Sequence, residues 1–134
     1  MPLVDVLQET FVAAAPRLVA DALAEPAVAA DLWPDLTVTV TQRRGLEGQR
    51  YAVHGAWRGT AELWLEPCAD GVLVHSYLRL DPTAGPVSAR VARREADRRQ
   101  RTMRWGLWRH KDRIEAGRAP GEAAVGTMVD RTAR

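Results

Sequence analysis

A single long helix is predicted for residues 86–116, which read PVSARVARREADRRQRTMRWGLWRHKDRIEA. Gly117 and Pro120 follow directly and are typical of a segment that ends a helix. At about 1.5 Å per residue, roughly 31 helical residues span about 46 Å. This is long for a small domain, so we expect the helix to cross the whole of the sheet that it packs against.

The apolar and small side chains of this helix fall on one stripe when residues are placed at steps of about 100°. The stripe is the expected buried face and consists of Ala89, Ala92, Ala96, Met103, Leu107, His110 and Ile114. Its first half is all alanine, and its second half carries the larger side chains. Small residues either let a helix approach a sheet closely or leave room for a ligand, and the sequence leaves both interpretations open.

The opposite face of the helix is basic and ends in two tryptophans. It consists of Arg90, Arg94, Arg98, Arg101, Trp105 and Trp108. One interpretation is a solvated face, on which Glu95 pairs with Arg99 at helical spacing. Asp97 then pairs with Arg101, and the tryptophans pack on short helices near the N-terminus. Two other interpretations stay open. The face is a surface for an anionic membrane or single-stranded nucleic acid, or it is a dimer contact through the tryptophans.

Upstream of this helix, the sequence predicts five strands joined by short turns. They are expected at residues 3–12, 36–43, 50–54, 60–66 and 72–80. Residues 36–43 and 60–66 alternate apolar and polar side chains, as half-buried strands do. Asp70-Gly71 is typical of a hairpin, and the glycines at both ends of residues 55–59 predict a turn or bulge. Short turns between consecutive strands indicate an antiparallel meander.

The first strand leads into two short helices. Two apolar sets compete for the inner face of this strand, namely Val4 with Val6, or Leu3 with Leu7 and Phe11. Pro16 and Pro26 each suit the first position of a helix, where the missing N–H has no partner. Trp33-Pro34 ends the second helix, since the residue before a proline is pushed out of the α region.

Composition fits one cytoplasmic domain. The 134 residues are 46% hydrophobic, and the net charge is only +2. The single cysteine, Cys68, allows no disulfide within the chain and fits a reducing compartment. We expect no signal peptide at the N-terminus, and no apolar stretch approaches the ~20 residues of a membrane helix. We expect one domain at residues 1–118 and a mobile tail at residues 119–134.

The order strand, two short helices, strand meander and long helix resembles the helix-grip plan of the SRPBCC/START-like superfamily. The likeness is carried at its start by Ala14-Ala15-Pro16, Val19, Leu23, Pro26 and Trp33-Pro34. Residues 59–67 (GTAELWLEP), 71–75 (GVLVH) and 108–117 resemble actinobacterial polyketide cyclase/dehydrase-like members. The resemblance covers residues 2–118, and the order of its motifs is more specific than any one of them.

The resemblance implies an α+β fold in which a curved antiparallel sheet wraps a long C-terminal helix around a lipid-, sterol- or polyketide-like ligand. It implies ligand binding more strongly than catalysis, with a polyketide cyclase/dehydrase-type enzyme as the alternative, and we expect no cofactor. Members usually have seven strands, whereas this sequence predicts about five. We therefore expect a shortened sheet with an exposed edge or a more open cavity mouth, which favours a homodimer formed edge to edge.

The residues expected to line the ligand cavity come from strands and helix. They are Val38, Tyr51, Val53, Leu63, Leu65, Val74, Ser76, Leu78, Met103, Leu107 and His110. If cyclisation occurs, His110 is the candidate proton shuttle and Tyr51 the orienting hydroxyl. The alternative for His110 is a core histidine satisfied by hydrogen bonds.

Two other histidines and one tryptophan are candidates for chemistry or contacts. His54 and His75 lie on separate predicted strands with no HxH or HxxxH spacing, so we expect no metal site. Trp64 shares the outer face of its strand with glutamates, and it indicates a partner contact or a cover from a chain terminus.

Overall fold

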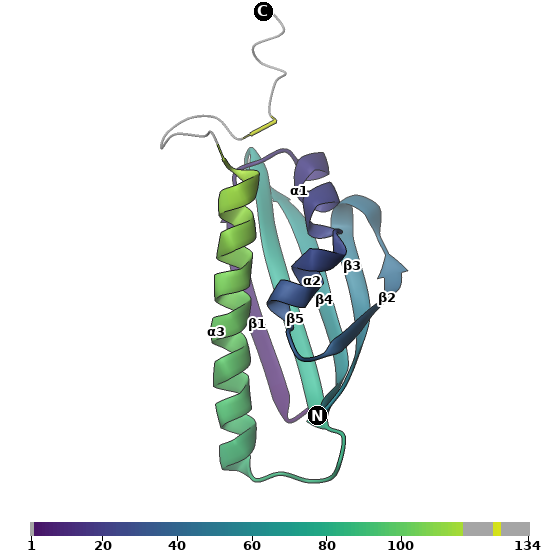
Figure 1. Cartoon of the computed structure of the whole chain (residues 1–134). Helices are drawn as coiled ribbons and strands as arrows, with labels where there is room; N and C mark the ends of the chain where they lie inside the picture. The colour runs from purple at the N-terminus through teal and green to yellow at the C-terminus, as the bar shows by residue number, and fades with distance from the viewer. Residues whose placement is uncertain (1, 117–124, 127–134) are drawn as a thin grey trace, which may run out of the picture.

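The computed structural model describes residues 2–116 and 125–126. Its elements are β1 (Val4–Val12), α1 (Pro16–Leu23), α2 (Pro26–Leu32), β2 (Thr37–Arg43), the 3-10 turn η1 (Gly45–Glu47), β3 (Gly48–His54), β4 (Trp57–Cys68), β5 (Gly71–Pro82) and α3 (Ala89–Ile114). The strands form one antiparallel sheet in the order β1-β5-β4-β3-β2. The three helices pack on one side of this sheet (Figure 1). The predicted α+β arrangement is confirmed, with five strands, two short helices after the first strand and a long C-terminal helix.

Side chains alternate between the two faces of the sheet, and β1 shows which set points inward. Val4 and Val6 are buried, whereas Leu3 and Leu7 are about half exposed. Val4 lies opposite Leu80 of β5 in the register, and both side chains join the core between sheet and helices. The structure therefore selects the Val4 and Val6 set, which the sequence could not distinguish from its competitor.

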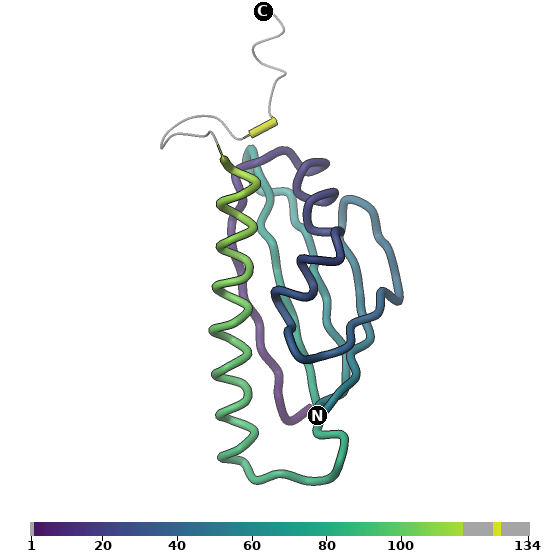
Figure 2. The backbone as a smooth tube through the Cα atoms, viewed as in Figure 1, coloured from purple at the N-terminus to yellow at the C-terminus, as the bar shows by residue number. Residues whose placement is uncertain are grey.

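The short helices α1 and α2 lie beside α3 on the same side of the sheet (Figure 2). Pro16 and Pro26 occupy their first turns, as the sequence predicts. Each helix is too short to be stable alone, and each is held by two large buried side chains. These are Val19 and Leu23 of α1, and Val28 and Leu32 of α2.

The long helix α3 follows β1 instead of crossing the whole sheet, so that expectation is wrong (Figure 1). Its contacts are mainly with β1 and α2, because α1 and α2 occupy the rest of the inner face. The Gln100 Nε2 donates a hydrogen bond of 2.8 Å to the Leu7 carbonyl of β1. The helix begins at Ala89 rather than near Pro86, since the Ser88 side chain caps it by accepting from the Val91 N–H.

The buried stripe of α3 differs in part from the predicted one. Its buried members are Ala92, Arg99, Met103, Gly106, Leu107 and His110. Ala89 is exposed, and Ala96 and Ile114 are half-buried. Gly106 is buried because α2 crosses there: a Cβ on it would lie 2.8 Å from Leu32 Cδ2 and 3.2 Å from the Asp31 carbonyl oxygen.

Arg99 is a buried cation at the centre of α3. Its Nε lies 2.8 Å from Glu95 Oε2, which confirms the predicted pair, but the arginine side chain is only 2% exposed and not on a solvated face. Its Nη1 donates 2.8 Å to the Pro34 carbonyl and so ties α3 to the end of α2. Within the described chain, Asp97 and Arg101 are not within ion-pair distance, so that predicted pair is wrong.

Two further expectations need correction. The turn predicted at residues 55–59 is shorter, because Trp57 already pairs with Pro82 and begins β4. The tryptophans of α3 are not covered by the short helices as expected: Trp105 is 61% exposed and Trp108 is 43% exposed.

The edges of the sheet and the chain beyond α3 complete the fold. β1 and β2 are the edge strands, and the homodimer expected from such an edge stays a prediction. The tail predicted at residues 119–134 lies outside the described residues except for Val125 and Gly126. Val125 pairs with the segment after β1, donating to the Ala13 carbonyl and accepting from the Ala15 N–H. Among the described residues, no helix combines the length and apolar character that crossing a bilayer requires.

Candidate functional site

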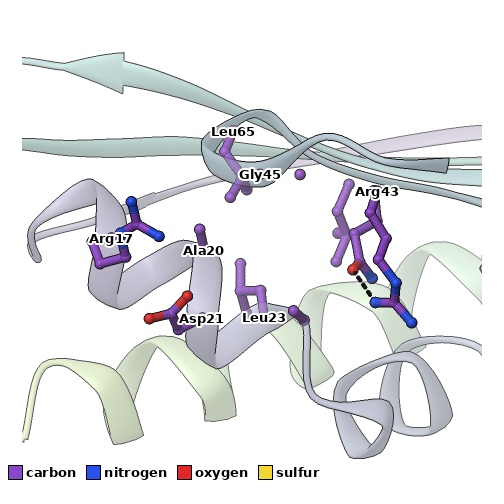
Figure 3. Close-up of a pocket in the computed structure, with 11 residues that line it drawn as sticks. Arg17, Ala20, Asp21, Leu23, Arg43, Gly45 and Leu65 are labelled. Carbon is purple, nitrogen blue, oxygen red and sulfur yellow. Dashed lines mark hydrogen bonds between the residues drawn. The ribbon is translucent and has the colours of Figure 1, made fainter.

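Two adjacent cavities lie between the α1–α2 pair and strands β2, β3 and β4. The first has a volume of about 200 Å3, and the second has a volume of about 390 Å3. Both are lined by Ala24, Arg43 and Gln49, so these three side chains form their common boundary. The wall that β4 contributes to the first cavity is apolar and consists of Leu63 and Leu65 (Figure 3).

The α1 wall of the first cavity is built from small side chains. Ala20 of this helix and Ala24, which caps its C-terminal end, line the wall beside the larger Leu23. Val19 and Leu23 pack on the sheet and set the distance between helix and strands. Alanine reaches only part of the way across that distance, so the space beneath Ala20 and Ala24 stays open.

Gly48 shapes the other side of this cavity, where η1 leads into β3. Its φ of 103° lies in the left-handed region, which glycine adopts without strain. A Cβ at this position would also collide with the Leu63 carbonyl oxygen. Glycine is therefore required for β3 to start so close to β4 at the cavity wall.

A chain of three polar side chains runs along the boundary of the cavities. Arg43 Nη1 donates 3.0 Å to Gln49 Oε1, and Gln49 Nε2 donates 2.9 Å to the Tyr51 hydroxyl oxygen. Gln49 and Tyr51 are both buried. We call these three residues the Arg43–Gln49–Tyr51 relay. The relay has the Arg43 cation at one end of the buried Gln49 amide and the Tyr51 phenol at the other end.

A β-bulge in β2 turns the Arg43 side chain toward the cavities. The register of β2 against β3 shifts between Val40 and Gln42. Without the shift, simple alternation would place Gln42 on the inner face after Val38 and Val40. The extra residue of the bulge moves Arg43 to that face instead, opposite Gln49.

The Tyr51 hydroxyl is positioned as a hydrogen-bond donor. Burial raises the pKa of this phenol, and the opposing effects of the Gln49 hydrogen bond and the Arg43 charge do not cancel that rise. The hydroxyl therefore stays protonated at neutral pH. Its oxygen accepts from Gln49, and in the described chain no acceptor takes its own proton. The hydroxyl can therefore donate a hydrogen bond to an acceptor atom of a ligand.

Two charged side chains of α1 lie at the mouth of the first cavity. Arg17 and Asp21 project from this helix, and Arg43 lies on the β2 side (Figure 3). Within the described residues, neither Arg17 nor Asp21 has an ion-pair partner. The first cavity thus has an apolar interior and a charged rim, which is the usual pattern of a small-molecule site.

The second cavity lies under α2 and against the edge of the sheet. Val38 and Val40 of β2, Ala29 of α2 and the Tyr51 ring line its apolar part. Strand β2 is an edge strand, and its inner valines are only half-buried. The open edge expected from a shortened sheet is therefore the side on which this cavity is found.

The residues predicted to line a ligand cavity separate into two groups. Leu63 and Leu65 line the first cavity, and Val38 and Tyr51 line the second. The others line neither cavity and lie in or beside the packed core between sheet and helices. They are Val53, Val74, Ser76, Leu78, Met103, Leu107 and His110.

His110 lies at the contact between α2 and α3, away from both cavities. Its Nδ1 is 2.9 Å from Arg113 Nη2, and its Nε2 is 2.8 Å from Asp31 Oδ2. Because a guanidinium only donates, Nδ1 accepts and Nε2 carries the proton given to Asp31. Both ring nitrogens are satisfied by structural partners, as in the alternative considered for this histidine.

Three buried polar atoms face the interior without a hydrogen-bond partner among the described residues. They are Thr10 Oγ1, Trp33 Nε1 and Ser76 Oγ. The Trp33 ring meets the Tyr51 ring edge on, with centroids 5.1 Å apart. Buried donors and acceptors are normally satisfied, so these three atoms are exceptions within the packed interior.

On the outer face of the sheet, His75 lies between two carboxylates. Its Nδ1 is 2.9 Å from Glu9 and its Nε2 is 2.9 Å from Glu66, and its ring stacks on Trp64 at 4.3 Å. Trp64 is thus covered in part by this histidine. His54 is exposed elsewhere, and the described residues hold no group of three His, Cys, Asp or Glu placed to bind a metal.

Sequence reasoning missed several residues of the cavities. Gln49 carried a usable signal, since Gln49, Tyr51 and Val53 alternate on one face once the strand is begun at Gly48. Arg43 carried none, because a bulge that changes the inward residue cannot be read from apolar alternation. Arg17 and Asp21 occupy polar positions of a short helix, and only the tertiary structure shows what lies beneath them.

The fold is shared with solved structures of low sequence identity, although no family model and no curated protein sequence matches the chain. DR_A0006 from Deinococcus radiodurans superposes with a TM-score of 0.62 at 12% identity, over 85% of this chain and 98% of that chain. The Aha1 dimer from Colwellia psychrerythraea superposes with a TM-score of 0.58 at 15% identity, over 87% of this chain and 99% of that chain.

A third structure is the di-domain aromatase/cyclase StfQ from the steffimycin biosynthetic pathway. It gives a TM-score of 0.51 at 14% identity, over 83% of this chain and 50% of that chain. Identities this low show the fold alone. Together with the sheet and helices described above, they confirm that this chain has the predicted helix-grip fold.

Proposed function

We propose that this protein binds a small hydrophobic molecule, lipid- or polyketide-like, in the two cavities under α1 and α2. The observation that carries the proposal is an apolar wall of Leu63 and Leu65 beside a buried hydrogen-bonding relay. Ligand sites combine a mostly apolar lining with a few polar groups that fix orientation. Burying apolar ligand surface there contributes roughly 25 cal/mol per Å2 before ordering costs.

The polar groups define the ligand further. The ligand has an apolar body for the space beneath Ala20 and Ala24, and one acceptor or anionic group near Arg43 or the Tyr51 hydroxyl. A purely aliphatic ligand would leave these donors unused.

The test is a binding titration with 1-anilinonaphthalene-8-sulfonate, an apolar dye with one anionic group. Ala20→Phe fills the first cavity from α1, and we expect it to weaken dye binding by about tenfold or more. Leu18→Phe adds a similar ring to the exposed side of the same helix and should bind like the wild type. Equal dye affinity in the two variants, with both folded, would refute the cavity as the binding site.

A second candidate function is a cyclase-type enzyme, favoured by the free proton of Tyr51. A buried neutral phenol can polarise a ligand carbonyl by donating a hydrogen bond. If Tyr51 donates such a hydrogen bond, the protein should bind 2-acetylnaphthalene more tightly than 2-ethylnaphthalene, which lacks the carbonyl. Tyr51→Phe should remove the preference and keep the affinity for the hydrocarbon. A wild-type protein with no preference would rule out this catalytic role.

A further inference from the structure

The positive charge of the molecule is concentrated on α3. This helix carries ten Lys or Arg and three Asp or Glu, a net charge of +7, whereas the whole chain has +2. The remainder of the protein is therefore acidic. A charge distribution of this kind orients a protein toward an anionic surface.

The cations and aromatic rings of α3 form one row on the side that faces away from the sheet. Its members are Arg90, Arg94, Arg101, Trp105 and Trp108, all of them exposed. Placed at about 100° per residue, they lie opposite the buried Ala92 and Met103 stripe. The row runs from Arg90 to Trp108 along a continuous helix, a length of roughly 27 Å.

The arginines of this row are not neutralised within the protein. The first half of the helix holds two acidic residues: Glu95 is bound by Arg98 and Arg99, whereas the exposed Asp97 is within ion-pair distance of neither Arg94 nor Arg101. No carboxylate of the described residues lies within ion-pair distance of Arg90, Arg94 or Arg101. Their charge is free to act on a partner.

The tryptophan pair supplies apolar surface at the end of the row. Trp105 and Trp108 meet edge to face, with ring centroids 5.5 Å apart and planes at 78°. They are 61% and 43% exposed. Tryptophan and tyrosine are enriched at the boundary between lipid headgroups and acyl chains, where two adjacent exposed indoles would fit.

We propose that this outer face of α3, defined by Arg90, Arg94, Arg101, Trp105 and Trp108, docks on the surface of an anionic phospholipid bilayer. The arginines would lie on the lipid phosphates, and the indoles would enter the headgroup region. A long helix on the outside of the molecule presents its row along a line, which a planar bilayer can contact throughout. The proposal is independent of the cavities under α1 and α2.

Two other partners fit the same face less well. Single-stranded nucleic acid is usually held in a basic groove with ring faces open to the bases. Here the row lies on the convex outside of a helix, and one indole face is covered by the edge of its neighbour. A second copy would bring two helices of net charge +7 together, which is unfavourable.

The experiment is co-sedimentation of the full chain with vesicles of phosphatidylcholine, with and without phosphatidylserine. We expect binding only when phosphatidylserine is present, weaker binding in high salt, and a blue shift of tryptophan emission. Arg94→Gln with Arg101→Gln should lower the partition coefficient about 25-fold, at about fivefold per arginine. Trp105→Ala with Trp108→Ala should remove the emission shift.

The matched control changes two exposed arginines of the sheet, Arg58→Gln with Arg79→Gln, and should bind vesicles like the wild type. If the Arg94/Arg101 and Arg58/Arg79 double variants lose vesicle binding equally, the effect depends only on net charge and the proposal is overturned. So would retention on a single-stranded oligonucleotide without vesicle binding. A wild-type dimer in sedimentation that the tryptophan variant abolishes, again without vesicle binding, would assign the face to self-association.

Discussion

The inner face of the sheet is covered in two ways. Along β1, the helix α3 packs closely, and neither of the two cavities described above extends beneath it. Over β2, β3 and β4, the short helices α1 and α2 leave two cavities. Both covers use alanine, but Ala92 of α3 is buried, whereas Ala20 of α1 and Ala24 at its C-terminal end border a cavity.

The difference follows from what sets the distance between layers. On the α3 side, polar ties draw helix and neighbours together, such as Gln100 to the Leu7 carbonyl and Arg99 to the Pro34 carbonyl. On the α1 side, Val19 and Leu23 act as spacers against the sheet. The small side chains next to these spacers do not reach the sheet, and a gap is left between helix and strands. The packed side therefore holds the fold together, and the open side is available for a ligand.

The largest effect that separates the two sides is expected from matched truncations of leucine. Leu78→Ala on the packed side should lower the free energy of unfolding by about 4 kcal/mol, because it opens a new cavity in a closed core. Leu65→Ala should cost about 2.5 kcal/mol, because Leu65 already borders a cavity and has fewer contacts to lose. Urea denaturation of both variants measures the difference.

The same pair also tests where the ligand space lies. Leu65→Ala enlarges the first cavity and should bind a bulkier apolar dye than the wild type does, whereas Leu78→Ala should not. If the two truncations cost the same and change dye binding alike, the division into a packed and an open side is incorrect.

A somewhat smaller effect is expected at the buried cation of the packed side. Arg99→Met keeps an unbranched chain in place but leaves the Pro34 carbonyl without its donor. We expect a loss of about 3 kcal/mol in the free energy of unfolding. Arg98→Met is the control, since Arg98 binds the same Glu95 from an exposed position and should cost less than about 0.5 kcal/mol. Similar losses would mean that Arg99 acts only as a surface charge.

The architecture could be predicted because its signals are periodic. Alternation along β2 and β4 and the 3.6-residue stripe of α3 depend on burial, which repeats along the chain. The path of α3 could not be predicted from its length, because the competing cover by α1 and α2 is a tertiary effect. The same holds for Arg99, whose long side chain reaches a buried carbonyl that only the fold provides.

The candidate site was harder to predict than the fold. Strand alternation predicts that Leu63, Leu65, Val38 and Tyr51 face inward, and in the structure they border the two cavities. Arg43 was missed because a single bulge in β2 exchanges it with Gln42. Sites tend to use such local irregularities, which periodic patterns do not encode.

The smallest effect concerns the relay on the open side and appears only at high pH. The pKa of Tyr51 is raised in the folded protein, while the unfolded chain titrates at its ordinary value near 10. Below about pH 10, both states hold the proton, and stability is unaffected. As the pH rises further, the unfolded state loses its proton first, so the free energy of unfolding falls by at most about 1.4 kcal/mol per pH unit.

Urea denaturation at about pH 9 and about pH 11 measures this fall, which Tyr51→Phe should remove. Tyr77→Phe, on the outer face of the sheet, leaves Tyr51 in place and should keep the fall. If Tyr51→Phe loses as much stability as the wild type over this interval, the phenol is solvated in the folded state. The open side would then be a hydrated groove, and the contrast with the packed side would concern water content instead of ligand space.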